Sequence, residues 1–225
     1  MAISQTLTVG FVDFPPHISL NEEYKESPLY QYVNEVFLQA DIEVTYIKLP
    51  GERALTELLK GRVDVLMPTS LPSHHKGIKT LPSPLFHTVP GLCFKKENYI
   101  PILSATHRFE KLNIGVPAGA QLVAALTESK ANLIPLNGDD ATSRGVELTQ
   151  RGRLDAFYHP SPIKVYHREN ALFKEVACSY FHGYSTPVYI AVANTVSKSS
   201  FIIINKAFQK AMLKEPYEYF FAMRK

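Results

Sequence analysis

The sequence predicts an α/β protein made of two similar lobes, and an internal repeat is the main observation behind this prediction. Residues 61–65 (GRVDV) and 152–156 (GRLDA) each lie where a polar, helix-like run gives way to an apolar strand. Upstream of each string, an apolar strand runs into a turn rich in proline or glycine, at residues 9–16 and 114–119. We therefore expect two lobes with a cleft that encloses a small solute, because ligand sites favour domain interfaces and the loops beyond strand ends.

Composition limits the class of protein. With 45% hydrophobic and 20% charged residues, the chain of 225 residues has an ordinary globular composition and is long enough for two small lobes. No apolar run approaches the roughly 20 residues that span a bilayer, so we expect no membrane insertion. The net charge of +3 is scattered, without a dense basic block or a basic helix, which argues against a nucleic-acid partner.

The N-terminus and the cysteines bear on the cellular compartment. Residues 1–4 have neither the basic nor the apolar region of a secretory signal, so the protein is either cytoplasmic or has lost a leader. Cys93 and Cys178 are too few for a disulfide framework, and each lies in an apolar, strand-like segment. We expect two buried free thiols rather than a bridge.

The first part of the chain alternates strands and helices, in the order of a largely parallel sheet covered on both faces. The expected strands are residues 7–13, 42–49 and 63–67. Ser27 and Pro28 supply an N-cap and a first-turn proline for a helix. The apolar face of this helix is expected to comprise Leu29, Tyr32, Val33, Val36, Phe37 and Ala40. A second helix, over residues 52–60, is expected to end at Gly61.

Five prolines between residues 68 and 90 exclude a long helix there. Residues 85–94 nevertheless look extended and are expected to form the first connection between the lobes, with residues 186–193 as the second. The second lobe is expected to contain strands at residues 114–116, 132–135, 154–158 and 174–181, and helices near residues 121–130, 140–151 and 161–168. A final helix capped by Ser199 or Ser200 returns the chain to the first lobe, followed by a short aromatic tail after Pro216.

Several strings also have the order and spacing of a known family. They lie at residues 9–17, 50–55, 59–64, 83–86, 114–119 and 152–157. Together they resemble the extracellular solute-binding proteins of family 3, bilobal type II periplasmic binding proteins that deliver polar amino acids to bacterial ABC transporters. The resemblance implies a first lobe from residues 1–88 and 187–225, a second lobe from residues 89–186, and two strands that join the lobes as a hinge.

The resemblance further implies ligand-binding positions in the first lobe. Asp13 and Phe14 follow the first strand, where such proteins place an aromatic ring against the ligand. Phe14 is the candidate ring, and the alternative is a core phenylalanine at a strand end. Thr69 and Ser70 follow the strand at residues 63–67, where the family holds a ligand carboxylate with hydroxyl and backbone N–H groups.

Two cationic positions are further candidates. The family carries an arginine a few residues beyond Ser70, whereas this chain offers Lys76 or His75. A lysine supplies a point charge rather than a two-pronged donor, which would alter carboxylate recognition. The alternative is a run of solvated surface residues. Arg53 begins the helix beyond Pro50 at the expected cleft edge, or makes a surface ion pair of little energetic consequence.

In the second lobe, the expected helix start after the strand at residues 114–116 offers free N–H groups to an anionic ligand group. The candidates there are Gly119, Ala120 and Gln121. Tyr158, at the end of the expected strand at residues 154–158, and His159, directly after it, are further candidates, and His159 stands where the amino-acid binders carry an aspartate for the ligand ammonium. An imidazole does not replace a fixed carboxylate, so we expect a small acid, a modified amino acid or another polar metabolite.

No pattern in the sequence supports catalysis. It contains no Gly-x-Ser-x-Gly elbow, His-Glu-x-x-His pair, Walker loop or Cys-x-x-Cys. The adjacent His74 and His75 point in different directions on a regular backbone and make a poor chelate. Asp64 and Asp155 are interpreted as structural caps or turn residues. We expect no catalytic residue, no cofactor and no metal.

The predicted function is that of a non-enzymatic, monomeric, periplasmic substrate-binding protein. It would close by hinge motion around a small polar solute, amino-acid-like or a small organic acid, and deliver it to an ABC permease in the membrane. The alternatives are the ligand-binding sensory domain of a receptor and, less favoured, an enzyme similar to cyclohexadienyl dehydratase.

Overall fold

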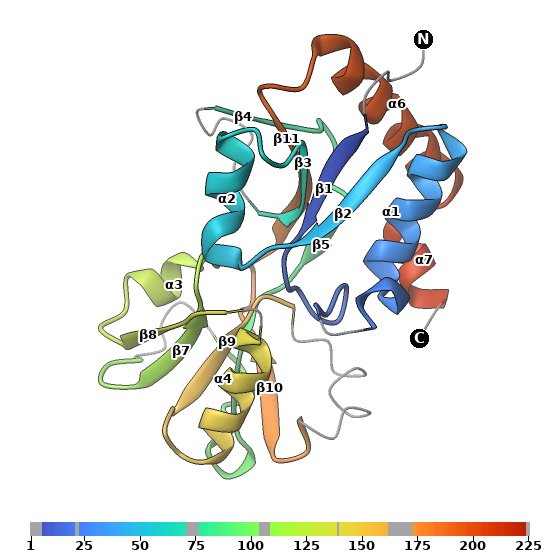
Figure 1. Cartoon of the computed structure of the whole chain (residues 1–225). Helices are drawn as coiled ribbons and strands as arrows, with labels where there is room; N and C mark the ends of the chain where they lie inside the picture. The colour runs from blue at the N-terminus through green and yellow to red at the C-terminus, as the bar shows by residue number, and fades with distance from the viewer. Residues whose placement is uncertain are drawn as a thin grey trace. The chain divides into compact units, whose positions relative to one another are not determined.

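The computed structural model describes residues 6–20, 23–70, 77–103, 109–138, 140–161 and 173–223. The chain folds into two compact units (Figure 1). Unit 1 comprises Met1–His87 and Pro187–Lys225, and unit 2 comprises Thr88–Thr186, so the chain passes from one unit to the other twice. Within the described parts, no helix combines the length and the apolar character that crossing a membrane requires.

Unit 1 is built on a mixed sheet. Its strands are β1 (Leu7–Phe11), β2 (Val44–Lys48), β3 (Val65–Thr69), β4 (Ile78–Thr80), β5 (Phe86–Thr88) and β11 (Thr186–Ala193). The strand order is β2-β1-β3-β11-β4, and β5 pairs with β11. β1 is parallel to β2 and β3, whereas β11 is antiparallel to β3. The three predicted strands of the first lobe are therefore present and adjacent, and β4 is a strand that sequence patterning missed.

The helices of unit 1 are α1 (Pro28–Gln39), α2 (Gly51–Leu59), α6 (Lys198–Lys214) and α7 (Tyr217–Met223), with a 3-10 turn η1 (Tyr24–Glu26). α1, α6 and α7 lie on one side of the sheet and α2 on the other (Figure 1). The apolar face predicted for α1 is confirmed for five of its six members, and the sixth, Ala40, is the half-buried C-cap.

Ser27 is the N-cap residue of α1 and Pro28 its first residue, as predicted, whereas two later predictions about the helix ends of unit 1 differ from the structure. Ser27 makes no capping hydrogen bond with its side chain, because its Oγ accepts from the backbone N–H of Ser19 at 3.2 Å. α6 is capped by Ser197, whose Oγ accepts from the N–H of Ser200 at 3.0 Å, rather than by Ser199 or Ser200. The expected aromatic tail is the helix α7, because the Pro216 carbonyl accepts its first N–H bonds.

Unit 2 holds a second mixed sheet. Its elements are β6 (Gly91–Lys95), η2 (Lys96–Asn98), β7 (Asn113–Pro117), α3 (Ala124–Thr127), β8 (Asn132–Leu136), α4 (Ala141–Gln150), β9 (Ala156–His159) and β10 (Val176–Tyr180). The strand order is β10-β6-β9-β7-β8. The extended run predicted at residues 85–94 is two strands, β5 and β6, interrupted at Val89 and Pro90. Most of the helix predicted near residues 161–168 lies outside the described residues.

The two sheets repeat one topology, as the sequence repeat predicts. In unit 1 the order β2-β1-β3-β11 joins three parallel strands to one antiparallel strand, and β8-β7-β9-β6 does the same in unit 2. Gly61 ends α2 with φ +66° and Gly152 ends α4 with φ +68°, a left-handed conformation that favours glycine. The two glycines of the repeated strings therefore perform the same structural task.

The aspartates of the repeated strings are structural, as predicted. Asp64 Oδ2 accepts a hydrogen bond from the N–H of Thr8 at 2.8 Å, and Asp155 Oδ2 accepts from the N–H of Asn113 at 2.7 Å. In both units the aspartate N–H donates back to the carbonyl of the same partner residue at 2.9 Å. Each aspartate thus joins the start of the third strand to the start of the first.

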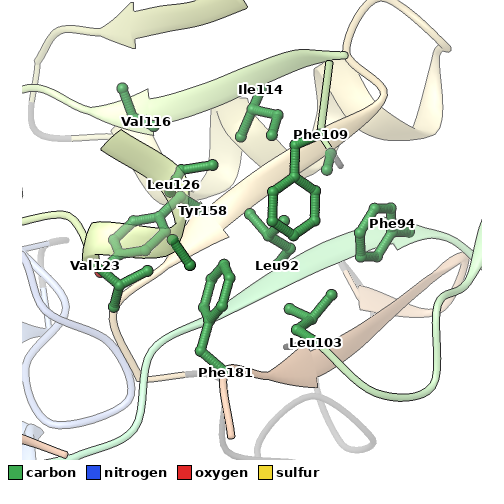
Figure 2. Packing of buried hydrophobic residues seen from close by; sticks show 12 residues of the cluster. Leu92, Phe94, Leu103, Phe109, Ile114, Val116, Val123, Leu126, Tyr158 and Phe181 are labelled. Carbon is green, nitrogen blue, oxygen red and sulfur yellow. The ribbon is translucent and has the colours of Figure 1, made fainter. Parts of the chain in front are cut away.

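Unit 2 buries apolar side chains on both faces of its sheet. On one face, Leu92 and Phe94 of β6 pack with Tyr158 of β9 and with residues from the surrounding segments (Figure 2). On the other face, Phe157 of β9 packs among residues from α4 and β10. Burial on both faces is typical of strands covered by other elements, and it explains why these strands are apolar almost throughout.

Gly145, in the interior of α4, has no room for a side chain. A Cβ at this position would overlap the ring of Phe157, which is fully buried. We expect Gly145→Ala to lower the free energy of unfolding by about 1–3 kcal/mol, although alanine normally stabilises a helix interior by about 1 kcal/mol relative to glycine. Urea denaturation measures the change, with Ser143→Ala, an exposed position of the same helix, as the control. Equal stability of the two variants would contradict this packing argument.

Cys93 and Cys178 form a disulfide, with an S–S distance of 2.00 Å. The prediction of two free thiols is therefore wrong. The cysteines lie on β6 and β10, which are antiparallel neighbours, and the strand register places them directly opposite each other. The pairing depends on which strands become neighbours, and the sequence does not reveal this for two cysteines 85 residues apart.

Candidate functional site

In unit 1, the predicted site residues that the structure describes lie at or just beyond one edge of the sheet. The parallel register aligns Phe11, the last residue of β1, with Lys48 of β2 and Met67 of β3. The loops that follow these three strands therefore leave from the same edge, which is where open α/β sheets bind ligands. Asp13 and Phe14 lie in the first of these loops.

Asp13 and Phe14 have mainly structural contacts. Asp13 Oδ1 accepts a hydrogen bond from the N–H of Leu20 at 3.0 Å, which closes the loop after β1. Phe14 forms a β-bridge with Ile18, and its side chain is only 9% exposed. Its ring centroid lies 6.1 Å from that of Phe86. These contacts favour the alternative of a core phenylalanine, and the role of Phe14 as a ligand platform stays a prediction.

Sequence analysis missed a buried histidine in the same loop. His17 is 5% exposed, and its ring stacks on Phe86 with a centroid distance of 4.2 Å and packs against Phe221 at 4.6 Å. Its Nδ1 lies 3.0 Å from the hydroxyl of Tyr217, and burial raises the pKa of that phenol well above its usual value. His17 thus fastens the loop after β1 to α7 and β5. Its partners are too distant in sequence to signal this arrangement.

The hydroxyl candidates lie at the end of β3. Thr69 is the last residue of that strand and is 8% exposed, and Ser70 follows it half-buried. Both therefore share the edge with Asp13 and Phe14. Lys76 and the alternative His75 lie outside the described residues.

Arg53 leaves the same edge on a helix. It lies in the first turn of α2, directly after β2, and its side chain is exposed. Among the residues that the structure describes, no carboxylate forms an ion pair with it, so the predicted alternative of a surface ion pair finds no support there. An exposed guanidinium at the sheet edge is available to an anionic ligand.

In unit 2, the helix expected to begin after β7 does not begin there, and this prediction is wrong. The Ala118 N–H donates to the Leu136 carbonyl at 2.9 Å, and the Ala120 N–H donates to the Pro117 carbonyl at 3.0 Å. A turn with Gly119 at φ +82° follows the strand, and α3 begins only at Ala124. Ala120 therefore offers no free N–H group. Gly119 and Gln121, which lie just beyond the end of β7, are exposed.

Tyr158 is a core residue of β9 that also contacts the chain after β7. It is 1% exposed, and its hydroxyl donates to the carbonyl of Gln121 at 2.8 Å. Burial raises the pKa of the phenol well above its usual value. The bond holds the chain after β7 against the end of β9, so Tyr158 positions Gln121.

His159 ends β9 and is fully buried. Its Nδ1 accepts a hydrogen bond from the N–H of Ser161 at 3.0 Å, and its ring lies near those of Phe157 and Phe173. An Nδ1 that accepts a hydrogen bond carries no proton, so the ring is neutral with its proton on Nε2. His159 therefore supplies no fixed charge of either sign.

Across both units, the described residues contain no group of three or more His, Cys, Asp or Glu side chains arranged to hold a metal ion.

The fold is shared with ligand-binding proteins of known structure. The GluR0 ligand-binding core in complex with L-glutamate matches with a TM-score of 0.78 and 17% identity, over 98% of each chain. The substrate binding protein of an amino acid ABC transporter matches with a TM-score of 0.75 and 18% identity, over 96% of this chain and 97% of that one. An L-arginine-bound substrate-binding protein from Streptococcus pneumoniae matches with a TM-score of 0.77 and 14% identity, over 97% and 94% of the chains.

No protein-family model matches the chain, and no curated protein sequence does. The likeness therefore concerns the fold. It confirms the predicted class: a two-lobed, type II periplasmic-binding-protein-like α/β fold with two sheets, in which the chain passes twice between the lobes. The resemblance to solute-binding proteins of family 3, inferred from short strings, is consistent with these structural neighbours.

Proposed function

We propose that the chain is the substrate-binding protein of an ABC-type importer and that it binds a small polar solute. The observation that carries the proposal is the full-length likeness of its fold to amino-acid-binding proteins. The candidate residues of each unit also lie at the edge of the sheet where the parallel strands end. This edge is the usual ligand-binding edge of such sheets.

The polar groups favour a ligand that carries a carboxylate. Thr69 and Ser70 supply hydroxyl donors, and Arg53 supplies an exposed guanidinium, at the binding edge of unit 1. Carboxylates accept hydrogen bonds from both kinds of donor. His159 is neutral and gives no negative charge for an ammonium group. The favoured solutes are a small organic acid or an amino-acid-like molecule with a modified amino group.

The disulfide supports a periplasmic location. Disulfides persist in oxidising compartments and are rare in the cytosol. Cys93 and Cys178 are the only cysteines of the chain, and both are in the bridge. A periplasmic protein would meet the permease at the outer face of the inner membrane, and we propose that it does so as a monomer.

A sensory domain is the second candidate, because the GluR0 ligand-binding core is among the matched structures.

An enzyme similar to cyclohexadienyl dehydratase is the third and less favoured candidate. One matched structure is an ancestral amino-acid-binding protein described as a precursor of cyclohexadienyl dehydratase. Binding without turnover is favoured here, and a turnover assay with prephenate and arogenate tests it. Product formation by the purified chain would refute a purely binding role.

A thermal-shift screen of amino acids and small organic acids tests the proposal. A ligand at 100 times its Kd stabilises the folded state by about 2.7 kcal/mol, which raises the Tm of a chain of this size by roughly 5–10 °C. We expect such a shift for a carboxylate-bearing solute.

A variant tests the assigned site. Thr69→Ala should weaken binding of the identified solute about tenfold, since one hydrogen bond to a charged group is lost. Ser143→Ala, far from the binding edge in sequence, serves as the control. A screen without any shift, or a Thr69→Ala protein that binds like the parent, would refute this assignment.

A further inference from the structure

The solvent face of α6 carries four lysines and no acidic residue. The helix has 17 residues and is about 25 Å long. It packs beside α1 through Phe208, whose ring meets that of Phe37 edge-on at 5.4 Å (Figure 1). Its sequence contains four lysines and neither aspartate nor glutamate. Sequence analysis found no basic helix, because the lysines are separated by three or more other residues.

The lysines share one face of the helix. Lys198, Lys206, Lys210 and Lys214 are separated by multiples of four residues, so they form one slowly turning stripe. All four side chains are exposed. Within the described ranges, none of them forms an ion pair or a side-chain hydrogen bond. Like charges four residues apart destabilise a helix, so this stripe carries a cost that folding does not explain.

Two large apolar side chains interrupt the stripe. Leu213 is 88% exposed and Ile202 is 42% exposed, and the helical period places both between the lysines. We call this set of four lysines with Ile202 and Leu213 the lysine face. Lys79 adds a further positive charge near the start of the helix, because the Lys79 Nζ lies 6.0 Å from the ring centroid of Phe201. The nearest carboxylate in sequence is Glu215, at the other end.

We propose that the lysine face docks on the surface of an anionic lipid bilayer. Its four charges run from the first to the last residue of one helix, which suits a flat, uniformly charged surface. Lysine is a point charge that tolerates many partner geometries, whereas recognition of an acidic protein surface favours arginine, and the helix has none. Leu213 and Ile202 would enter the interfacial region while the lysine stems extend to the headgroups. This inference does not depend on the identity of the solute.

Vesicle co-sedimentation with the full chain tests the proposal. We expect binding to vesicles of phosphatidylcholine with about one third phosphatidylglycerol, no binding to pure phosphatidylcholine, and weaker binding as NaCl rises from about 0.05 to about 0.5 M. Each lysine near an anionic surface contributes about fivefold to binding, so Lys206→Glu with Lys210→Glu should weaken it at least roughly 25-fold. Leu213→Ser should weaken it less, through lost apolar insertion alone.

A matched variant distinguishes the effect of the lysine face on vesicle binding from the effect of the protein's net charge. Lys96→Glu with Lys130→Glu makes the same change in charge at two exposed positions of unit 2 and should leave vesicle binding unchanged. Circular dichroism checks that each variant is folded. If Lys206→Glu with Lys210→Glu does not fold, Lys206→Gln with Lys210→Gln is measured in its place. Failure of the parent to bind anionic vesicles, or equal loss in both glutamate pairs, would overturn the proposal. Capture of an acidic protein through α6 without vesicle binding would also overturn it.

Discussion

Reduction of the Cys93–Cys178 disulfide is expected to lower the free energy of unfolding of unit 2 by about 2–5 kcal/mol. The bond joins β6 to β10, the first and last of the strands that the structure describes wholly within unit 2. Its sequence separation of 85 residues means that it closes nearly the whole unit into one loop. The reduced, unfolded chain gains conformational freedom that the oxidised one lacks, and the gain grows with loop length.

Urea denaturation with and without a reductant measures this effect, and amide hydrogen exchange assigns it to a unit. Exchange should accelerate in β7 and β9 of unit 2 and stay unchanged in β1 and β3 of unit 1, which the bond does not constrain. The double variant Cys93→Ala with Cys178→Ala should resemble the reduced protein and should not respond to reductant. Two titratable thiols in the unreduced, denatured protein would show that the bond does not form.

The sequence predicts the fold well where structure is local or repeated. The apolar spacing from Leu29 to Phe37 defines the buried face of α1, and the GRVDV and GRLDA strings mark the same helix end and strand start in both units. These features depend on residues a few positions apart. Glycine in a left-handed conformation and aspartate bonded to a neighbouring strand have recognisable local signatures.

Features that depend on strand order are not visible in the sequence. Cys93 meets Cys178 only because β10 adds to the sheet beside β6. His17 acquires its environment from Phe86, Tyr217 and Phe221, which come from two other elements. The lysine face is hidden for a different reason, since the final helix is predicted but its lysines are separated by three or more other residues and form no dense basic block.

The candidate site is predicted in position better than in detail. Loops after parallel strands reach one sheet edge, so Asp13, Thr69 and Ser70 share a location that patterning anticipates. Exposure is a separate matter. Tyr158 and His159 are the last residues of the apolar strand β9, and whether their side chains meet a ligand or the core depends on packing from distant segments. The binding proposal therefore rests on Thr69 and Ser70 at the end of β3 and on the exposed Arg53.

Alkaline pH is expected to destabilise both units, because each buries tyrosine hydroxyls. Burial, reinforced by the carboxylates of Glu215 and Glu35, raises the pKa of Tyr32 in unit 1 to about 12. Burial raises the pKa of Tyr217 in unit 1 and Tyr158 in unit 2 well above the usual value of 10. All three residues are at most 4% exposed.

The sign follows from proton linkage. The folded protein keeps these protons to a higher pH than the unfolded chain does, so their contribution to stability is complete below pH 10 and is lost as the pH rises through the folded-state pKa. Each buried tyrosine should reduce the free energy of unfolding by roughly 1 kcal/mol between pH 10 and 11. Tyr32 and Tyr217 together should therefore cost unit 1 roughly 2 kcal/mol over this interval.

Urea denaturation between pH 8 and 11, followed by circular dichroism, measures the slope of stability against pH. Tyr32→Phe removes the hydrogen bond of that hydroxyl to the Glu215 carbonyl, so it should lower stability at pH 8 yet flatten the slope above pH 10. Tyr219→Phe, at a position that is 58% exposed, should leave the slope unchanged. Both cysteines are in the disulfide, so no thiol of the chain is available to exchange with it at high pH. Stability that stays level to pH 11 would mean that these hydroxyls are not buried in solution.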